Sequence, residues 1–112
     1  MPSIIKKSFD SPDKTSSPAE KMKVDFVEVG DLKIQKVTAE PGWQWSKHLK
    51  PVVGGESCQV NHRIHLLSGK LMSRTDDGME EELGPGDVAF IPAGHDGWVV
   101  GDEKAVWLEI VK

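Results

Sequence analysis

The sequence predicts a single all-β domain of the sandwich or barrel type. From residue 24 onward, apolar and polar side chains alternate over short stretches. Glycine or proline interrupts these stretches about every ten residues, a spacing typical of many short strands. No stretch there shows a sustained 3.6-residue period with capping residues, so we expect little helix. With 112 residues and a mass of 12.3 kDa, the chain has room for one domain.

The expected strands can be placed in order along the chain. Two alternating stretches, 24–29 and 32–37, flank the turn pair Gly30-Asp31, which favours a hairpin. A break at Glu40-Pro41-Gly42 follows. Further strands are expected over residues 43–49, 58–67, 70–74, 79–83, 88–91, 98–100 and 105–111, with a loop over 51–55.

The first 22 residues differ in composition from residues 23–112, which we take as the domain. Lysine, serine, aspartate and proline dominate residues 1–22, so little apolar surface is available to offset the entropy of ordering them. We expect a flexible N-terminal arm. Because the arm carries Ile4, Ile5 and Phe9, an alternative is that it packs against a partner subunit.

The charge and cysteine content exclude several classes of protein. Eighteen acidic and fourteen basic residues give a net charge of −4, which argues against nucleic-acid binding. No apolar run is long enough to span a bilayer, and the N-terminus lacks the apolar core of a signal peptide. One cysteine allows no internal disulfide. We therefore expect a cytoplasmic protein without nucleic-acid or membrane partners.

Cys58 and His62 are the first candidates for chemistry. Alternate residues of a strand share a face, so a strand over 58–67 would direct Cys58 and His62 inward and His65 outward. Four strand positions span about 13 Å, which is too far for both inward groups to bind one metal ion unless the strand bends. The same separation, and the lack of an evident third group, argue against a nucleophilic Cys58 activated by His62. An ordinary buried role for Cys58 is the alternative.

One stretch resembles the first motif of the cupin superfamily. Gly42 followed six positions later by His48 is similar to the opening of that motif, although Lys50 stands where a second histidine is usual. Counting back seven positions from Gly69 places His62 where cupins usually carry glutamate.

The second motif is a better match. The segment 86–94 resembles the turn and strand that lead to the last cupin ligand; that ligand position holds Gly97, with His95 two positions earlier. Residues 94–103 are also similar to a group of small, mostly uncharacterised, single-domain bacterial cupins. The resemblance covers residues 24–111. It implies a single cupin barrel, which is a double-stranded β-helix or jelly roll, and a homodimer paired through edge strands.

The resemblance also implies a divalent metal held by His48, His62 and His95. Three imidazoles suit Zn, Fe, Ni, Cu or Mn, and a three-ligand site leaves a position open for water or substrate. Ligation needs neutral imidazole, so metal binding should weaken below about pH 6. Dioxygenase, isomerase or lyase chemistry on a small organic ligand is then implied. The alternative is that these histidines only make hydrogen bonds at the barrel mouth.

A small organic ligand would need a pocket beside these histidines. The expected ligand-binding residues are Trp43, Trp45, Lys50, Cys58 and Trp98. The tryptophans would form apolar walls, with ordinary core packing as the alternative, and Lys50 would hold a carboxylate or another anion. Two further hypotheses stay open: a metal-free, non-catalytic binding or sensor module, and an interaction module acting through its dimer surface.

Overall fold

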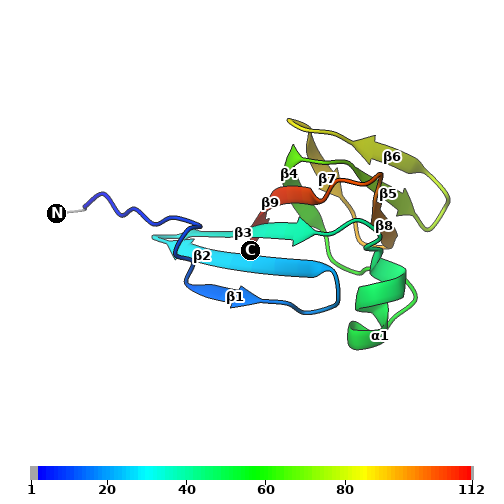
Figure 1. Cartoon of the computed structure of the whole chain (residues 1–112), viewed down its shortest axis with the longest axis horizontal. Helices are drawn as coiled ribbons and strands as arrows, with labels where there is room; N and C mark the ends of the chain where they lie inside the picture. The colour runs from blue at the N-terminus through cyan, green and yellow to red at the C-terminus, as the bar shows by residue number, and fades with distance from the viewer. Residues whose placement is uncertain (1–2, 112) are drawn as a thin grey trace.

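Two antiparallel sheets form the structure, which is a computed structural model that describes residues 3–111. The six-stranded sheet has the order β1-β2-β3-β9-β4-β7, and the three-stranded sheet has the order β6-β5-β8 (Figure 1). The larger sheet contains β1 (Lys14–Ser16), β2 (Met22–Val29), β3 (Leu32–Ala39), β9 (Ala105–Val111), β4 (His62–Ser68) and β7 (Val88–Ile91). The smaller sheet contains β6 (Glu80–Leu83), β5 (Leu71–Thr75) and β8 (His95–Val99). The prediction of an all-β fold is confirmed.

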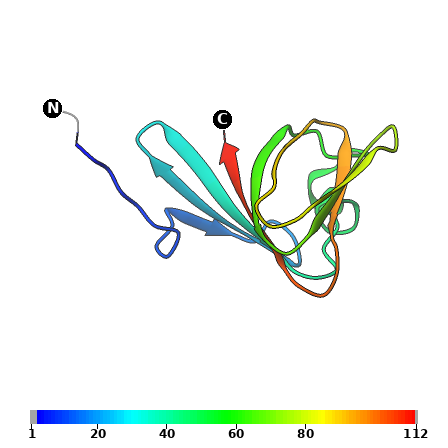
Figure 2. The same ribbon diagram turned by 90° about the horizontal axis from the view of Figure 1, so that it is seen from above.

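Figure 2 shows the two sheets curving toward each other, with the turn between β2 and β3 (cyan) extending away from them. Strands β2 and β3 pair over their full length through the turn at Gly30, and β9 pairs with both β3 and β4. Alternate residues of these strands face inward, and Leu66 is fully buried. The buried core consists of Val37, Ala39, Trp43, Trp45, Cys58, Ile64, Leu66, Leu71, Leu83, Ile91, Val99, Ala105 and Trp107.

The segment after β3 contradicts the predicted strand over 43–49. A π-helical turn, η1 (Trp45–Leu49), continues directly into the short helix α1 (Lys50–Val53), so the expected loop over 51–55 also begins as helix. Neither described helical segment is long and apolar enough to cross a membrane. Little helix is present, as expected, but it lies where a strand was predicted.

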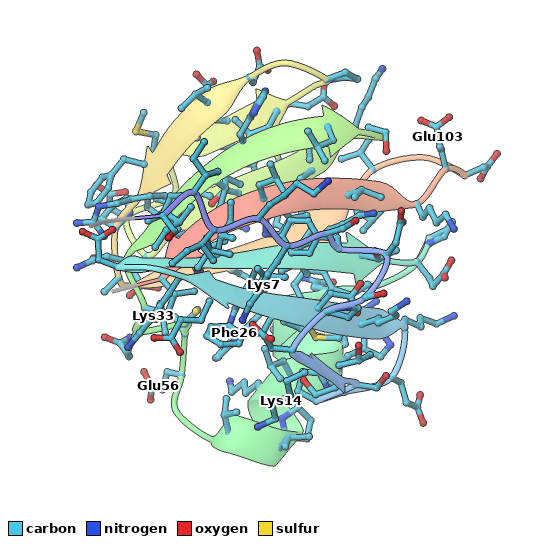
Figure 3. All side chains as sticks on the ribbon, turned by 90° about the vertical axis from the view of Figure 1, so that its left-hand side faces the viewer. Lys7, Lys14, Phe26, Lys33, Glu56 and Glu103 are labelled. Carbon is cyan, nitrogen blue, oxygen red and sulfur yellow. The ribbon has the colours of Figure 1, made fainter. Side chains whose placement is uncertain are left out.

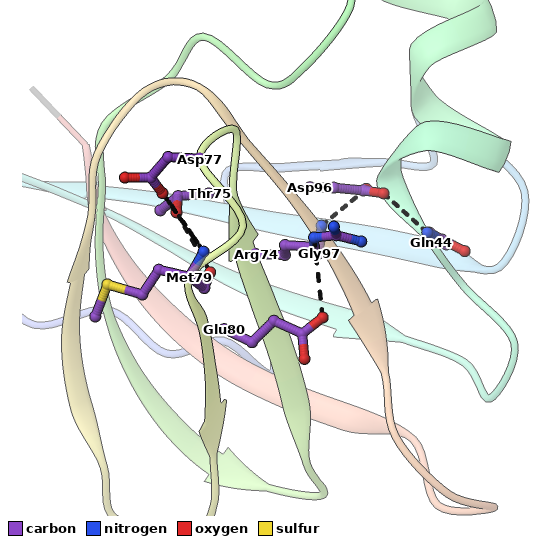
Figure 4. A network of polar contacts seen from close by, with 8 residues as sticks. All are labelled: Gln44, Arg74, Thr75, Asp77, Met79, Glu80, Asp96 and Gly97. Carbon is purple, nitrogen blue, oxygen red and sulfur yellow. Dashed lines mark hydrogen bonds and ion pairs between the residues drawn. The ribbon is translucent and has the colours of Figure 1, made fainter.

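A contact distant in sequence explains why this segment turns. The Asp96 carboxylate on β8 accepts a hydrogen bond from the Gln44 side chain at 2.8 Å (Figure 4). It also accepts the Ser46 backbone N–H at 3.0 Å. The carboxylate thus satisfies a donor at the start of the turn, as a capping side chain does. Pro51 stands in the first turn of α1, where a missing N–H costs nothing, and Gly54 at φ 80° ends the helix.

Part of the segment expected to be an arm is hydrogen-bonded to the larger sheet. Strand β1 pairs with β2, and the neighbouring Asp13 carboxylate accepts the Glu28 backbone N–H at 2.8 Å. The Lys7 ammonium group lies 2.9 Å from the same carboxylate, and Figure 3 shows Lys7 over the sheet. Nearer the N-terminus the chain leads away from the sheets (Figure 1), and Ile4 is fully exposed.

Candidate metal centre and ligand cavity

Three side chains that can bind a metal converge inside the barrel. The ligand atoms of Cys58, His62 and His95 all lie within 4.8 Å of one another. His62 is the first residue of β4 and His95 the first of β8, so the two imidazoles come from different sheets. Cys58 and His95 form an isolated bridge in which the Cys58 backbone N–H donates to the His95 carbonyl at 2.8 Å.

This arrangement corrects the expectation that Cys58 and His62 are about 13 Å apart. The Cys58 Sγ atom is 3.5 Å from His62 Nε2, because the predicted strand over 58–67 begins only at His62. Cys58 is bridged to β8, whereas His62 belongs to the larger sheet, so the chain crosses between sheets at residues 59–61. Val60, which would face inward with Cys58 and His62 in a continuous strand over 58–67, is 52% exposed. His65 is exposed, as predicted.

The hydrogen bonds of the two histidines determine which nitrogen is free. His62 Nδ1 lies 2.6 Å from the Glu109 carboxylate, and His95 Nδ1 lies 2.7 Å from the Pro92 carbonyl. Because both oxygens accept, each Nδ1 carries the proton and Nε2 is left for a metal. The two rings meet edge to face, with their centroids 5.0 Å apart.

The thiol and imidazole of this cluster have displaced pKa values. Burial alone would raise the pKa of Cys58, but hydrogen bonds with His62 and His95 outweigh it and lower the pKa to about 6. Burial alone would lower the pKa of His62, but Cys58 and Glu109 raise it to about 9. The two shifts favour a thiolate beside an imidazolium in the metal-free pair. A thiolate is the form of cysteine that binds metal, and a bound metal would replace the proton on His62 Nε2.

Glu109 was not identified from the sequence, although it belongs to the site. A glutamate in a strand is usually exposed, so the sequence pattern did not indicate a role for Glu109 in the site. The available signal was the alternation along the last strand, where Ala105 and Trp107 are buried and Glu109 falls on the same face. Its carboxylate supplies the third group that seemed to be missing beside Cys58 and His62.

A cavity of about 1080 Å³ adjoins the cluster. Its walls include Trp43, Trp45 and Trp107, and Cys58, His62 and Glu109 line one part of it. The rings of Trp43 and Trp107 are tilted against each other with centroids 6.2 Å apart. Among the described buried side chains, the Trp43 indole N–H alone has no hydrogen-bond partner.

The remaining predicted site residues lie elsewhere. His48 is in η1, where its Nδ1 accepts the Gln44 backbone N–H at 3.1 Å, and it is not in the described group of side chains that could hold a metal. Lys50 begins α1, and Trp98 lies on the face of β8 opposite His95. Neither residue lines the described cavity. Of the five expected ligand-binding residues, the structure thus brings Trp43, Trp45 and Cys58 to the cavity.

Comparisons with known proteins support the fold. No protein-family model matches the sequence, and no curated protein matches it. A cupin-2 domain protein from Rhodospirillum rubrum aligns with a TM-score of 0.62 and 16% identity, over 86% of this chain and 62% of that chain. The polyketide cyclase RemF from Streptomyces resistomycificus aligns with a TM-score of 0.59 and 21% identity, over 83% and 66%.

A third solved structure has the same architecture. A cupin-superfamily sugar phosphate isomerase from Silicibacter pomeroyi aligns with a TM-score of 0.56 and 20% identity, over 81% of this chain and 59% of that chain. At such identities the likeness establishes a fold and not an activity. Together with the two antiparallel sheets, these alignments show that the chain has the cupin fold, a jelly-roll barrel.

Proposed function

We propose that this barrel binds a divalent transition metal through Cys58, His62 and His95, with a small organic ligand beside it. The distance of 3.5 Å between Cys58 Sγ and His62 Nε2 supports this most directly. In tetrahedral coordination, with Zn–S about 2.3 Å and Zn–N about 2.0–2.1 Å, these two atoms would stand about 3.6 Å apart. Three protein ligands leave one position for water or for the organic ligand.

The donor set narrows the choice of metal. Thiolate is a soft ligand that favours zinc or copper over manganese, and imidazole suits both. Three histidines would accept Zn, Fe, Ni, Cu or Mn. With Cys58 as one of the three ligands, we propose zinc. When bound, zinc would polarise an oxygen atom of the ligand as a Lewis acid. In this proposal, Cys58 replaces His48, the third ligand that the resemblance to cupins implies.

The cavity walls indicate the kind of organic ligand. Trp43, Trp45 and Trp107 offer flat apolar surfaces, which favour a ligand with a planar, carbon-rich body. An oxygen atom at one end of the ligand would face the metal, and a second acceptor would satisfy the unpartnered Trp43 indole N–H. The similarity to a polyketide cyclase is consistent with such a ligand.

Metal analysis tests the proposal. Tag-free protein purified without chelator should carry about one zinc ion per chain by mass spectrometry, and His62→Ala should lose it. His48→Ala is the matched control, because it removes an imidazole outside the cluster and should retain the metal. A protein that is isolated without metal and takes up no added zinc would contradict the proposal.

A second candidate function is nucleophilic catalysis by Cys58 without a metal. His62 contacts both other groups: its Nδ1 lies 2.6 Å from the Glu109 carboxylate, and its Nε2 lies 3.5 Å from Cys58 Sγ. This is the arrangement of orienting group, base and nucleophile in acyl-transfer enzymes. Metal-free protein would then release p-nitrophenol from an activated ester in a burst that Cys58→Ala abolishes. No burst with fully folded, metal-free protein would exclude this candidate.

We also propose that two copies pair through β7. This strand forms one edge of the larger sheet, so its outer backbone groups are free for pairing. Val88 and Phe90 on it are 79% and 57% exposed. Light scattering should give twice the chain mass, and Phe90→Lys should reduce it to one chain mass; a monomeric wild type would contradict pairing.

A further inference from the structure

We infer that Glu109 is a positioning residue for the proposed metal centre: its carboxylate holds the His62 ring with Nε2 directed at the ion. The inference rests on the proposed function. The Glu109 carboxylate lies 2.6 Å from His62 Nδ1, and its side chain is only 13% exposed. Metal-binding histidines commonly donate their second ring N–H to such an oxygen, which fixes the orientation of the ring.

The register of the sheet produces this contact. Glu109 on β9 stands opposite Ile64 on β4, and His62 is two residues before Ile64 on the same face. The Glu109 and His62 side chains are therefore diagonal neighbours, a separation that long side chains bridge. A shift of one residue in this pairing would turn Glu109 to the outer face.

The other histidine is held differently. His95 Nδ1 faces the Pro92 carbonyl, which belongs to the turn just before β8. That acceptor is part of the backbone and is present whatever side chains surround it. The orientation of His62 therefore depends on a side chain that can be replaced, whereas the orientation of His95 depends on the path of the chain.

The charge of Glu109 also suits the metal. A divalent ion and the Cys58 thiolate together carry one positive charge, and the Glu109 carboxylate balances it. Uncompensated charge is costly beside the apolar walls of the cavity. Within the described part of the chain, His62 is the one residue that forms an ion pair with Glu109. The carboxylate is thus directed to this centre and is not engaged by another cation.

Zinc affinity of Glu109 variants tests the inference. Affinity would be measured by competition with a chromophoric chelator for the wild type, Glu109→Ala and Glu109→Gln. Loss of an outer partner of this kind weakens metal binding about 10–100-fold, and we expect this for Glu109→Ala. Glu109→Gln keeps an acceptor oxygen without the charge. Its zinc affinity should lie between those of Glu109→Ala and the wild type. Glu81→Gln, which changes an exposed glutamate of β6, should match the wild type.

A spectroscopic measurement separates positioning from a loss of stability. In cobalt-substituted protein, Glu109→Ala should change the visible absorption of the metal, because the His62 ring is no longer fixed, while circular dichroism stays that of the folded barrel. Unchanged zinc affinity and an unchanged cobalt spectrum in Glu109→Ala would overturn the inference and leave the proposed function intact. A wild type that binds neither ion would overturn both.

Discussion

Two regions of the molecule contribute lining residues to the cavity in different ways: the paired strands β3, β4 and β9, and the connecting segment 44–61. The strands supply alternate residues such as His62, Trp107 and Glu109, and each position follows from the register of a ladder. The connecting segment supplies Trp45 from a π-helical turn and Cys58 from a crossing between sheets. Its positions depend on a few specific contacts.

The difference indicates a division of roles. The ladders bury the core and should account for most of the stability, since each ladder residue is held by neighbours on both sides. The connecting segment completes the proposed metal centre and one wall of the cavity. Substitutions in the strands should therefore lower the free energy of unfolding, and substitutions in the segment should change binding more than stability.

The largest effect should come from Leu66→Ala in β4. Leu66 is fully buried, and such a truncation costs about 2–5 kcal/mol because it leaves a cavity. Urea unfolding followed by circular dichroism would measure it. Leu67→Ala changes the next residue, which is 42% exposed on the outer face, and should cost about 0.5 kcal/mol or less. Equal losses for both variants would contradict the inward and outward assignment of β4.

A smaller effect on stability, but a large one on metal binding, should come from Cys58→Ser. This change removes a proposed direct ligand. Loss of an outer partner weakens metal binding by up to about 100-fold, and zinc affinity should fall by more than that in Cys58→Ser. Isothermal titration calorimetry would measure the change, with His65→Ala on the outer face as the control. If Cys58→Ser binds zinc as tightly as the wild type does, the third ligand is another residue.

Asp96→Ala should have a moderate effect centred on the connecting segment. The variant loses the hydrogen bonds to the Gln44 side chain and the Ser46 backbone N–H, and loss of a comparable cap costs about 0.5–2 kcal/mol. Hydrogen exchange should rise in residues 45–53 and stay unchanged in β3 and β9. Asp102→Ala, in an exposed turn, is the control. Uniform acceleration throughout the barrel would show that Asp96 stabilises the whole fold.

The smallest effect should be the pH dependence of the N-terminal contact. Hydrogen bonds from the Glu28 backbone N–H and, to a smaller degree, from the Lys7 ammonium group hold the pKa of the Asp13 carboxyl below its usual 3.8. A lowered pKa means that the carboxylate stabilises the contact above about pH 4. This stabilisation is lost as the pH falls through the lowered value. Protection of the Glu28 amide from hydrogen exchange should decrease in acid, and Asp13→Asn should remove this pH dependence. If protection is equally acid-sensitive in Asp13→Asn, a group other than Asp13 causes the pH dependence.

The predictable part of the fold is the part built from local alternation. The hairpin around Gly30 and the last strand follow from periodicity and turn residues, which act over a few positions. The helical turn at Trp45 could not be predicted in this way, because Trp43 and Trp45 alternate as in a strand. The partner that turns the chain there, Asp96, is about fifty positions away in the sequence.

The site was predictable to a similar extent. The chemistry of imidazole and the motif positions make His62 and His95 candidate ligands, and parity places Cys58 on the same face as His62. The pattern names His48 as the third ligand, however, and the strand spacing argues against one metal ion being shared by Cys58 and His62. The short distance between Cys58 and His62 could not be predicted, because it depends on the bridge between Cys58 and His95. The alternation along β9 can place Glu109 on the inner face. Its position next to His62 depends on the pairing of β9 with β4, which no local pattern indicates.

The tryptophans around the cavity also make the protein its own optical reporter. The chain has four tryptophans and no tyrosine, so nearly all of its ultraviolet fluorescence comes from indole. Three of the four indoles, those of Trp43, Trp45 and Trp107, line one cavity. Molecules that enter it would alter the emission of most of the fluorophores at once, so unlabelled protein can be used to screen a compound library.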